Sequence, residues 1–249
     1  MPDDTLRTWI ARHIQVRQRL KRVCTGYLLF LMVVTTNHTL EEAARFSAMH
    51  KSQFSKMLKG HQHIAAHTLE SLSKQQAKRL SNSLESLKGL PWTMVIIIDS
   101  TLQHRASRHP ENAQKFNHGQ GFVIGHQWTN IVFILNGIVI PLRPIPFYSQ
   151  RYCVDHDLVY LTEHERVVDY LSHLNLDDYI GSHRSRDVVV LTDSGYDNKK
   201  IETAIANKKW AFIIALSKTR SVKSETLYHT SPKSKQWSSV DLFFRHHRR

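Results

Sequence analysis

Residues 93–99 read TMVIIID, and residues 188–193 read VVVLTD. Each segment is a run of apolar, mainly β-branched residues that ends in an aspartate, Asp99 in the first and Asp193 in the second. A continuous apolar run of this length is too short for a helix and is typical of a strand that is buried on both faces. If the two strands lie side by side in one sheet, both aspartates reach the same edge of that sheet.

The residues between these two segments predict an antiparallel part of the sheet. The dipeptide Asn136-Gly137 favours a type I′ hairpin between two of the expected strands. The strands are expected at Phe122–Ile124, Asn130–Leu135 and Ile138–Leu142.

Helices and strands alternate in the remainder of this region. A helix is expected over Asp157–Leu174 and another over Asn198–Lys208, with strands at Val188–Leu191 and Ala211–Leu216, the latter also buried. The order β-β-β-α-β-α-β is that of the ribonuclease-H-like fold, whereas doubly wound folds begin with βαβ. We therefore expect an α/β core with a ribonuclease-H-like mixed sheet over residues 91–217, preceded by a helical region over residues 1–90.

Within residues 1–90, two short helices are expected to form a helix-turn-helix. Thr39 precedes one helix as an N-cap, with Glu42 three residues later, and Ser52 is expected to cap a second helix over Gln53–Leu58. Phe54, Met57 and Leu58 would face inward. The exposed polar side chains expected to meet DNA are Lys51, Gln53, Ser55 and Lys56. An ordinary helical hairpin is the alternative interpretation.

The charge of the chain indicates a polyanionic partner. Lys and Arg number 34 against 21 Asp and Glu, which gives a formal net charge of +13. The basic residues are spread along the whole chain, so nucleic acid is favoured over an anionic membrane surface or a ribosomal neighbour. With only two cysteines, Cys24 and Cys153, and no apolar run of about 20 residues, we expect neither a disulfide framework nor a membrane span, which fits the cytoplasm.

Asp99 and Asp193 are candidate ligands for Mg²⁺ or Mn²⁺. Carboxylate oxygens are the ligands that these ions prefer, and two ions about 4 Å apart activate a nucleophile and stabilise the leaving oxygen in displacement at phosphorus. The alternative is that an aspartate after a strand only caps a helix or begins a turn.

Several segments of the chain resemble the bacterial insertion-sequence DDE transposases. They are IDST from Ile98, GHQWTN from Gly125, IPLRPIPF from Ile140, TDSGYDNKK from Thr192 and AFIIALSKTRSVK from Ala211. The resemblance covers roughly residues 93–249. It implies an endonuclease and strand-transfer enzyme of DNA recombination, with Asp99 and Asp193 matching the first two of three acids.

The resemblance also implies partners and a location. The expected partners are double-stranded DNA, as transposon ends and target, and a second copy of the chain in a homodimer assembled on DNA. The expected location is the bacterial cytoplasm, at the nucleoid.

The third acid of this family is a Glu on a helix after the last core strand. Glu225 is the candidate, although its neighbours are poor helix formers and a proline follows at Pro232. Residues 218–249 are interpreted as the start of an insertion or of a C-terminal segment in a truncated copy, which predicts very slow cleavage. Lys218, Arg220 and Lys223 are candidate phosphate contacts or a solvated charge run.

Two other functions stay open at this point. One is a non-catalytic, DNA-binding transposase remnant. The other is a structure-specific nuclease of the same fold, which needs Glu225 or Asp241 to complete its site.

Overall fold

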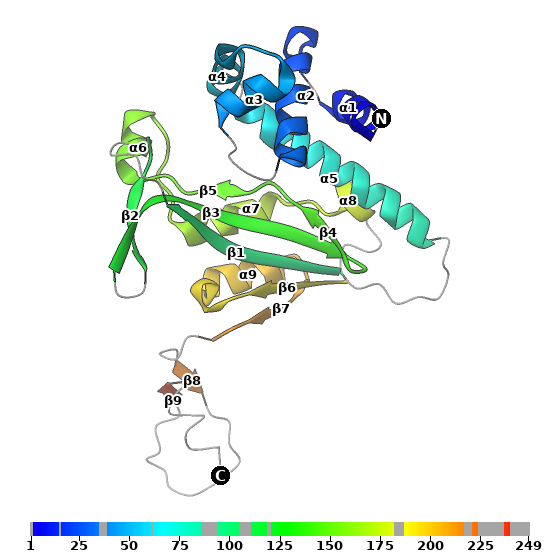
Figure 1. The fold of residues 1–249 in the computed structure, drawn as a ribbon. Coiled ribbons are helices and arrows are strands. Elements are labelled where there is room, and N and C mark those ends of the chain that lie inside the picture. Colours follow the sequence, from blue (N-terminus) through cyan, green and yellow to red (C-terminus); the bar gives the residue numbers. More distant parts are fainter. Residues whose placement is uncertain are drawn as a thin grey trace, which may run out of the picture. The chain divides into compact units, whose positions relative to one another are not determined.

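The computed structural model describes residues 2–14, 16–34, 39–60, 62–85, 94–104, 111–118, 121–181, 187–216, 221–223 and 237–239. Packing divides the chain into two compact units, drawn as ribbons in Figure 1. The first unit comprises residues 1–88 together with residues 140–143. The second comprises residues 89–139 and 144–249.

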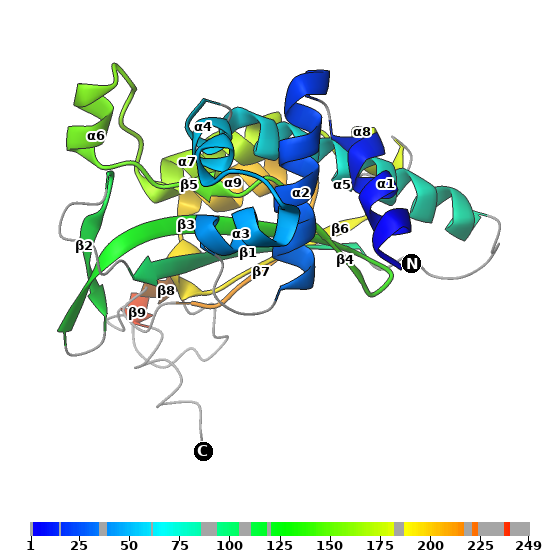
Figure 2. The same cartoon turned by 45° about the horizontal axis from the view of Figure 1, so that its top comes forward.

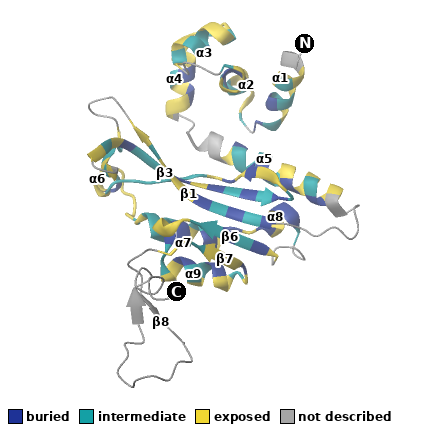
Figure 3. Cartoon of the chain, turned by 60° about the horizontal axis from the view of Figure 1, so that its bottom comes forward, coloured by how far each residue is buried: buried dark blue, intermediate teal, exposed yellow. Residues whose placement is uncertain are grey.

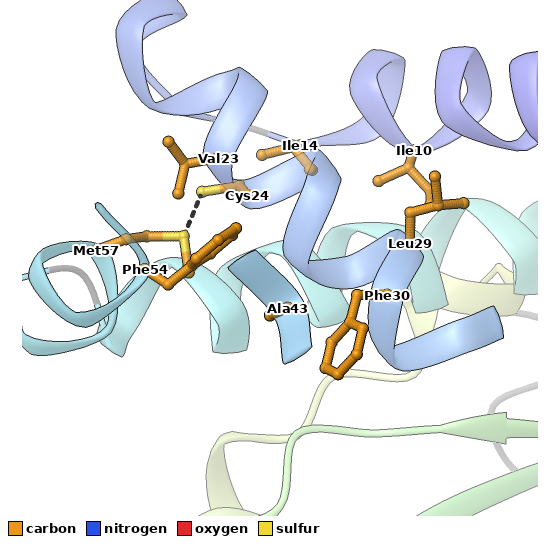
Figure 4. Packing of buried hydrophobic residues seen from close by; sticks show 9 residues of the cluster. All are labelled: Ile10, Ile14, Val23, Cys24, Leu29, Phe30, Ala43, Phe54 and Met57. Atoms are coloured by element: carbon orange, nitrogen blue, oxygen red, sulfur yellow. Dashed lines mark hydrogen bonds between the residues drawn. The ribbon is translucent and has the colours of Figure 1, made fainter. Parts of the chain in front are cut away.

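The first unit is helical, as the sequence predicts. Its described helices are α1 (Pro2–His13), α2 (Gln18–Val33), α3 (Leu40–Ser47), α4 (Lys51–Gly60) and α5 (Gln62–Glu85). A buried cluster joins α1 to α4, and Figure 4 shows its side chains meeting between these helices. It contains Ile10, Ile14, Val23, Cys24, Leu29, Phe30, Ala43, Phe54 and Met57. No described helix is both long and apolar enough to cross a bilayer.

The cap of α3 is confirmed. The Thr39 side chain accepts a hydrogen bond from the backbone N–H of Glu42 at 3.2 Å. The structure shows only this half of a capping box at α3, and Oε2 of Glu42 is buried without a hydrogen-bond partner.

The second helix of the pair differs from the sequence expectation. It begins at Lys51, before Ser52, because the Gln53 side chain reaches back and accepts from the backbone N–H of His50 at 3.2 Å. Phe54 and Met57 face inward at 0% and 7% exposure, but Leu58 is 37% exposed and its expected inward position is wrong.

The second unit is built on a mixed sheet. Its described strands follow the order β2-β3-β1-β6-β7, and β4 and β5 pair with β3 (Figure 1). Two further strands, β8 and β9, form a separate antiparallel pair. The strand bounds are β1 Met94–His104, β2 Gln114–His118, β3 Gly121–Leu135, β4 Ile138–Pro141, β5 Ile145–Pro146, β6 Val188–Thr192, β7 Ala211–Ile214, β8 Ser221–Lys223 and β9 Trp237–Ser239.

The strand directions agree with the expected mixed sheet. β1 is central, antiparallel to β3 and parallel to β6, and β6 is parallel to β7. This arrangement is compatible with a ribonuclease-H-like fold. Helices α7 and α9 pack against each other, and α9 also contacts β7 (Figure 2). The helix bounds in this unit are α6 Gln150–Asp155, α7 Glu163–His173, α8 Asp177–Ile180, the 3₁₀ helix η1 Ser194–Tyr196 and α9 Lys199–Asn207.

The two strands expected at Phe122–Ile124 and Asn130–Leu135 are one strand, β3, of 15 residues. Gly125 lies within it, opposite His104, and a Cβ there would lie 2.0 Å from the carbonyl oxygen of Gln103. The glycine therefore allows close approach of β1 rather than breaking the strand. The hairpin after β3 is confirmed, with positive φ at Asn136 (48°) and Gly137 (81°).

The helix expected over Asp157–Leu174 is shorter. α7 begins after Thr162, which forms a complete capping box with Glu165. The preceding segment turns at Asp157, whose φ is 51°, and leaves Leu158 46% exposed. The expected third buried strand is also wrong in one respect, because β7 ends the described sheet and leaves Ile213 65% exposed.

Candidate functional site

Asp99 and Asp193 follow the last paired residues of two adjacent parallel strands. The β1–β6 register ends at Ile98 opposite Thr192, so the next residue of each chain segment is one of the two aspartates. Neighbouring strands lie about 4.8 Å apart. The two aspartates therefore occupy neighbouring positions along the sheet, and both are exposed.

Asp99 lies within its strand, which corrects the expectation that the strand ends there. β1 continues to His104 because β3 still pairs with it, Asp99 lying opposite Asn130. What ends at Asp99 is the buried part of β1, whose residues alternate between buried and half-buried up to Ile98 (Figure 3). The two aspartates thus lie where β6 ends and β1 continues.

Both aspartates belong to the same face of the sheet. Successive side chains of a strand point to opposite faces. Asp99 therefore shares the face of Ile97, and Ile97 pairs with Leu191. Asp193 keeps an extended backbone, with φ −79° and ψ −178°, and so continues the face of Leu191.

The Asp193 carboxylate has a structural role as well. It caps η1, accepting a hydrogen bond from the backbone N–H of Gly195 at 3.0 Å through Oδ1. This is the turn-forming role that the sequence leaves open as an alternative. Its Oδ2 has no hydrogen bond to the described residues.

No positive charge balances this pair within the described part of the chain. Neither Asp99 nor Asp193 forms a salt bridge there, and the Asp99 carboxylate accepts no hydrogen bond from a described side chain. The neighbouring Asn130 instead donates its side-chain N–H to Thr101 Oγ1 at 2.7 Å. Two carboxylates at neighbouring positions without a counterion repel each other.

A polar network joins the η1 turn to α7 and β3. The half-buried Glu163 carboxylate accepts hydrogen bonds from Gln127 Nε2 at 2.7 Å, from Thr129 Oγ1 at 3.2 Å and from the Tyr196 hydroxyl at 2.7 Å. His164 Nε2 lies 2.7 Å from the carbonyl oxygen of Gly195. These contacts hold the turn that carries Asp193.

Tyr196 is the buried anchor of that turn, at 2% exposure. Burial raises the pKa of its hydroxyl, and the Glu163 carboxylate adds to the rise, so the hydroxyl stays protonated and donates. Sequence reasoning missed Glu163, His164 and Tyr196. Two features of the sequence could have pointed to them. The capping motif TEHE from Thr162 contains Glu163 and His164, and Tyr196 follows Asp193 within three residues.

The four predicted DNA-contacting residues lie on α4 in the first unit. Lys51, Gln53 and Lys56 are exposed, and Ser55 is half-buried. Lys51 lies 3.7 Å from Glu41, an exposed ion pair that contributes little to stability.

Comparison with solved structures finds complexes of the Mos1 transposase. A pre-cleavage Mos1 transpososome is 11% identical with a TM-score of 0.26, over 76% of this chain and 57% of that chain. The Mos1 strand transfer complex is 11% identical with a TM-score of 0.25, over 80% and 58%.

A paired-end complex with the left transposon end is 12% identical with a TM-score of 0.26, over 80% and 59%. This chain therefore spans less than two thirds of the matched chains. No protein-family model matches the sequence, and no curated protein matches it.

The remaining predicted site residues are not brought to the aspartates by the described structure. Glu225, Lys218 and Arg220 lie outside the described residues, as does Asp241. Lys223 ends β8, where it pairs with Trp237 of β9. Among the residues that are described, no three His, Cys, Asp or Glu side chains group in a way that could hold a metal ion.

Proposed function

We propose that this chain is a DDE-type DNA transposase whose Asp99 and Asp193 hold Mg²⁺ or Mn²⁺ for cleavage and strand transfer at insertion-sequence ends. The observation that supports this proposal is the β1–β6 register, which sets the two aspartates at neighbouring positions on one face of the sheet. Their donor set fits the cation, because it consists of exposed carboxylate oxygens without a described counterion.

The protein's own residues would act by positioning. Asp99 is fixed by a strand that is paired on one side by β3, and Asp193 by the η1 turn, which Tyr196 and Glu163 anchor. A divalent ion, when bound, polarises a phosphate oxygen and lowers the pKa of a coordinated water or hydroxyl. A rigid sheet and a hydrogen-bonded turn keep both carboxylates ready for that ion, which is the preorganisation that phosphoryl transfer requires.

Titration with Mn²⁺ tests the site directly. We expect the full chain to bind Mn²⁺ and Asp99→Asn or Asp193→Asn to weaken binding by at least about 10-fold, as loss of metal-supporting groups commonly does. Isothermal titration calorimetry measures the affinity. The matched control is Asp187→Asn, because Asp187 is exposed and precedes the same strand that Asp193 follows. Equal affinity in all four proteins would contradict the proposed site.

The DNA-binding part of the proposal depends on α4. The double variant Lys51→Gln/Lys56→Gln is expected to weaken binding to duplex DNA uniformly across sequences. It should also lower the salt dependence of log affinity by about two, one for each lysine–phosphate contact. Fluorescence anisotropy at several salt concentrations measures both. The control Lys78→Gln/Arg79→Gln removes the same charge from exposed positions on α5. An equal loss of DNA affinity in the control would show that α3 and α4 form an ordinary helical hairpin that does not contact DNA.

One observation favours a non-catalytic DNA-binding protein as the second candidate. The Asp193 carboxylate already caps η1, so this aspartate has a structural explanation without a metal. The two candidates differ in the Mn²⁺ titration, since a protein in which Asp193 is only a cap has no Mn²⁺ affinity to lose. Its folding stability should change little on Asp193→Asn, because an Asn Oδ1 accepts the same hydrogen bond from Gly195.

A further inference from the structure

A hollow of about 300 Å³ lies within the first unit, between α1, α2 and the end of α3. Its polar lining includes Arg7 from α1, four side chains from α2 and Ser47 from α3. The four from α2 are Gln18, Lys21, Arg22 and Thr25. Their spacing of three, four and seven residues sets them on one face of the helix. We call this hollow the α1–α2 pocket.

Among the side chains that the structure describes, which do not include those of Asp3 and Asp4 on α1, the cations of the α1–α2 pocket have no acidic partner. Arg7, Lys21 and Arg22 form no salt bridge with any described carboxylate. Positive charges gathered around one hollow repel one another, and an anion bound among them would relieve that repulsion.

A second observation points independently to a ligand. Thr25 is 5% exposed, and its Oγ1 is buried without a hydrogen-bond partner. A buried hydroxyl without a partner costs free energy, and Thr25 is one of the residues that line the same pocket as the three cations. An anion with several oxygens would accept from the hydroxyl and from the guanidinium groups together.

The chemistry and position of the pocket fit a phosphate group. Guanidinium forks match phosphate oxygens in geometry, and Gln18 adds a further donor. The pocket also adjoins the turn that leads into α4. Ser47 closes α3 at that turn and donates its hydroxyl to the carbonyl oxygen of Gly26 on α2 at 3.3 Å. A phosphate in the pocket would therefore lie beside the helix-turn-helix.

We infer that the α1–α2 pocket binds a phosphate group of the DNA backbone and thereby fixes the helix-turn-helix on its site. Arg7, Lys21 and Arg22 supply the charge, and the Thr25 hydroxyl supplies a directed hydrogen bond. The pocket stands on contacts inside the first unit. Only the assignment of its phosphate to DNA rests on the proposed function.

The test compares four forms of the full chain. They are the wild type, Thr25→Val, the pocket variant Arg7→Gln/Lys21→Gln/Arg22→Gln and the control variant Arg12→Gln/Arg17→Gln/Arg19→Gln. The control removes three exposed charges from the same helical region. Thr25→Val keeps the side-chain shape and removes only the unpartnered hydroxyl, so we expect its melting temperature to be unchanged or higher.

Inorganic phosphate, compared with chloride at equal ionic strength, is the first probe. It should raise the melting temperature of the wild type and of the control, but not of Thr25→Val or the pocket variant. Duplex DNA is the second probe, measured by anisotropy. The pocket variant should bind at least about tenfold more weakly, with a salt slope lower by about one, and the control within about threefold of wild type.

The outcomes separate the two sources of phosphate and the two proposals. A shift with inorganic phosphate but equal DNA affinity in both triple variants would assign the pocket to free phosphate. Equal behaviour of all four forms with both probes would overturn the pocket. A wild type that binds no DNA would contradict the proposed function. The comparison with inorganic phosphate would still show whether the pocket binds a phosphate group.

Discussion

Replacing Asp99 or Asp193 by Asn is expected to slow metal-dependent DNA cleavage by about 10²- to 10³-fold. The expectation follows from charge and position, because phosphoryl transfer depends mostly on holding cations against the reacting phosphate. An Asn keeps the shape of the side chain and removes the negative charge. The measurement is nicking under single-turnover conditions with Mg²⁺ and with Mn²⁺, on duplex DNA from the regions that flank the chain's own gene.

The control for this assay is Asp187→Asn, which should cleave within about twofold of the wild type because surface changes away from a site have small effects. Cleavage that is insensitive to Asp193→Asn would overturn the mechanism. Glu225→Gln adds a separate comparison. The sequence predicts that Glu225 is a poor third acid and that cleavage is slow. Robust cleavage that Glu225→Gln abolishes would show that this residue completes the metal site.

The sequence predicts the central part of the sheet because the apolar composition of a short segment indicates that it is buried. The runs that end at Ile98 and Leu191 are apolar at every position, as parallel strands covered on both faces require, and the structure pairs them. The ends of strands are not predicted by local composition, because they depend on neighbouring strands. β1 continues past Asp99 because β3 is long enough to pair with it, and that length depends on Gly125, which a local pattern reads as a break.

The errors in the remaining elements also have non-local causes. The apolar residues of β7 have the composition of a buried strand, but the strand ends the described sheet and leaves Ile213 exposed. The network around Glu163 joins α7, β3 and η1, which are far apart in the sequence. No local pattern predicts that three donors converge on one carboxylate. The two aspartates could therefore be predicted from the sequence, whereas the network that holds the Asp193 turn could not.

Affinity for duplex DNA is expected to fall by about 10³-fold or more between about 50 mM and about 200 mM salt. Each phosphate that a Lys or Arg neutralises releases counterions, and the released ions make binding weaker as salt rises. A formal net charge of +13, spread over the chain, supplies enough cations for several phosphate contacts. Anisotropy titrations at four or more salt concentrations give the slope of log affinity against log salt.

Single-stranded DNA provides the internal comparison for this prediction. The slope per phosphate contact is about 0.7 for single strands and about 0.9 for duplex DNA, so the same contacts on a duplex must show the steeper dependence. A protein that reads duplex geometry through α4 should also lose affinity on single strands at every salt concentration. Binding that does not change with salt would show that the positive charge faces away from the DNA. In that case the helix-turn-helix and the α1–α2 pocket would both need another partner.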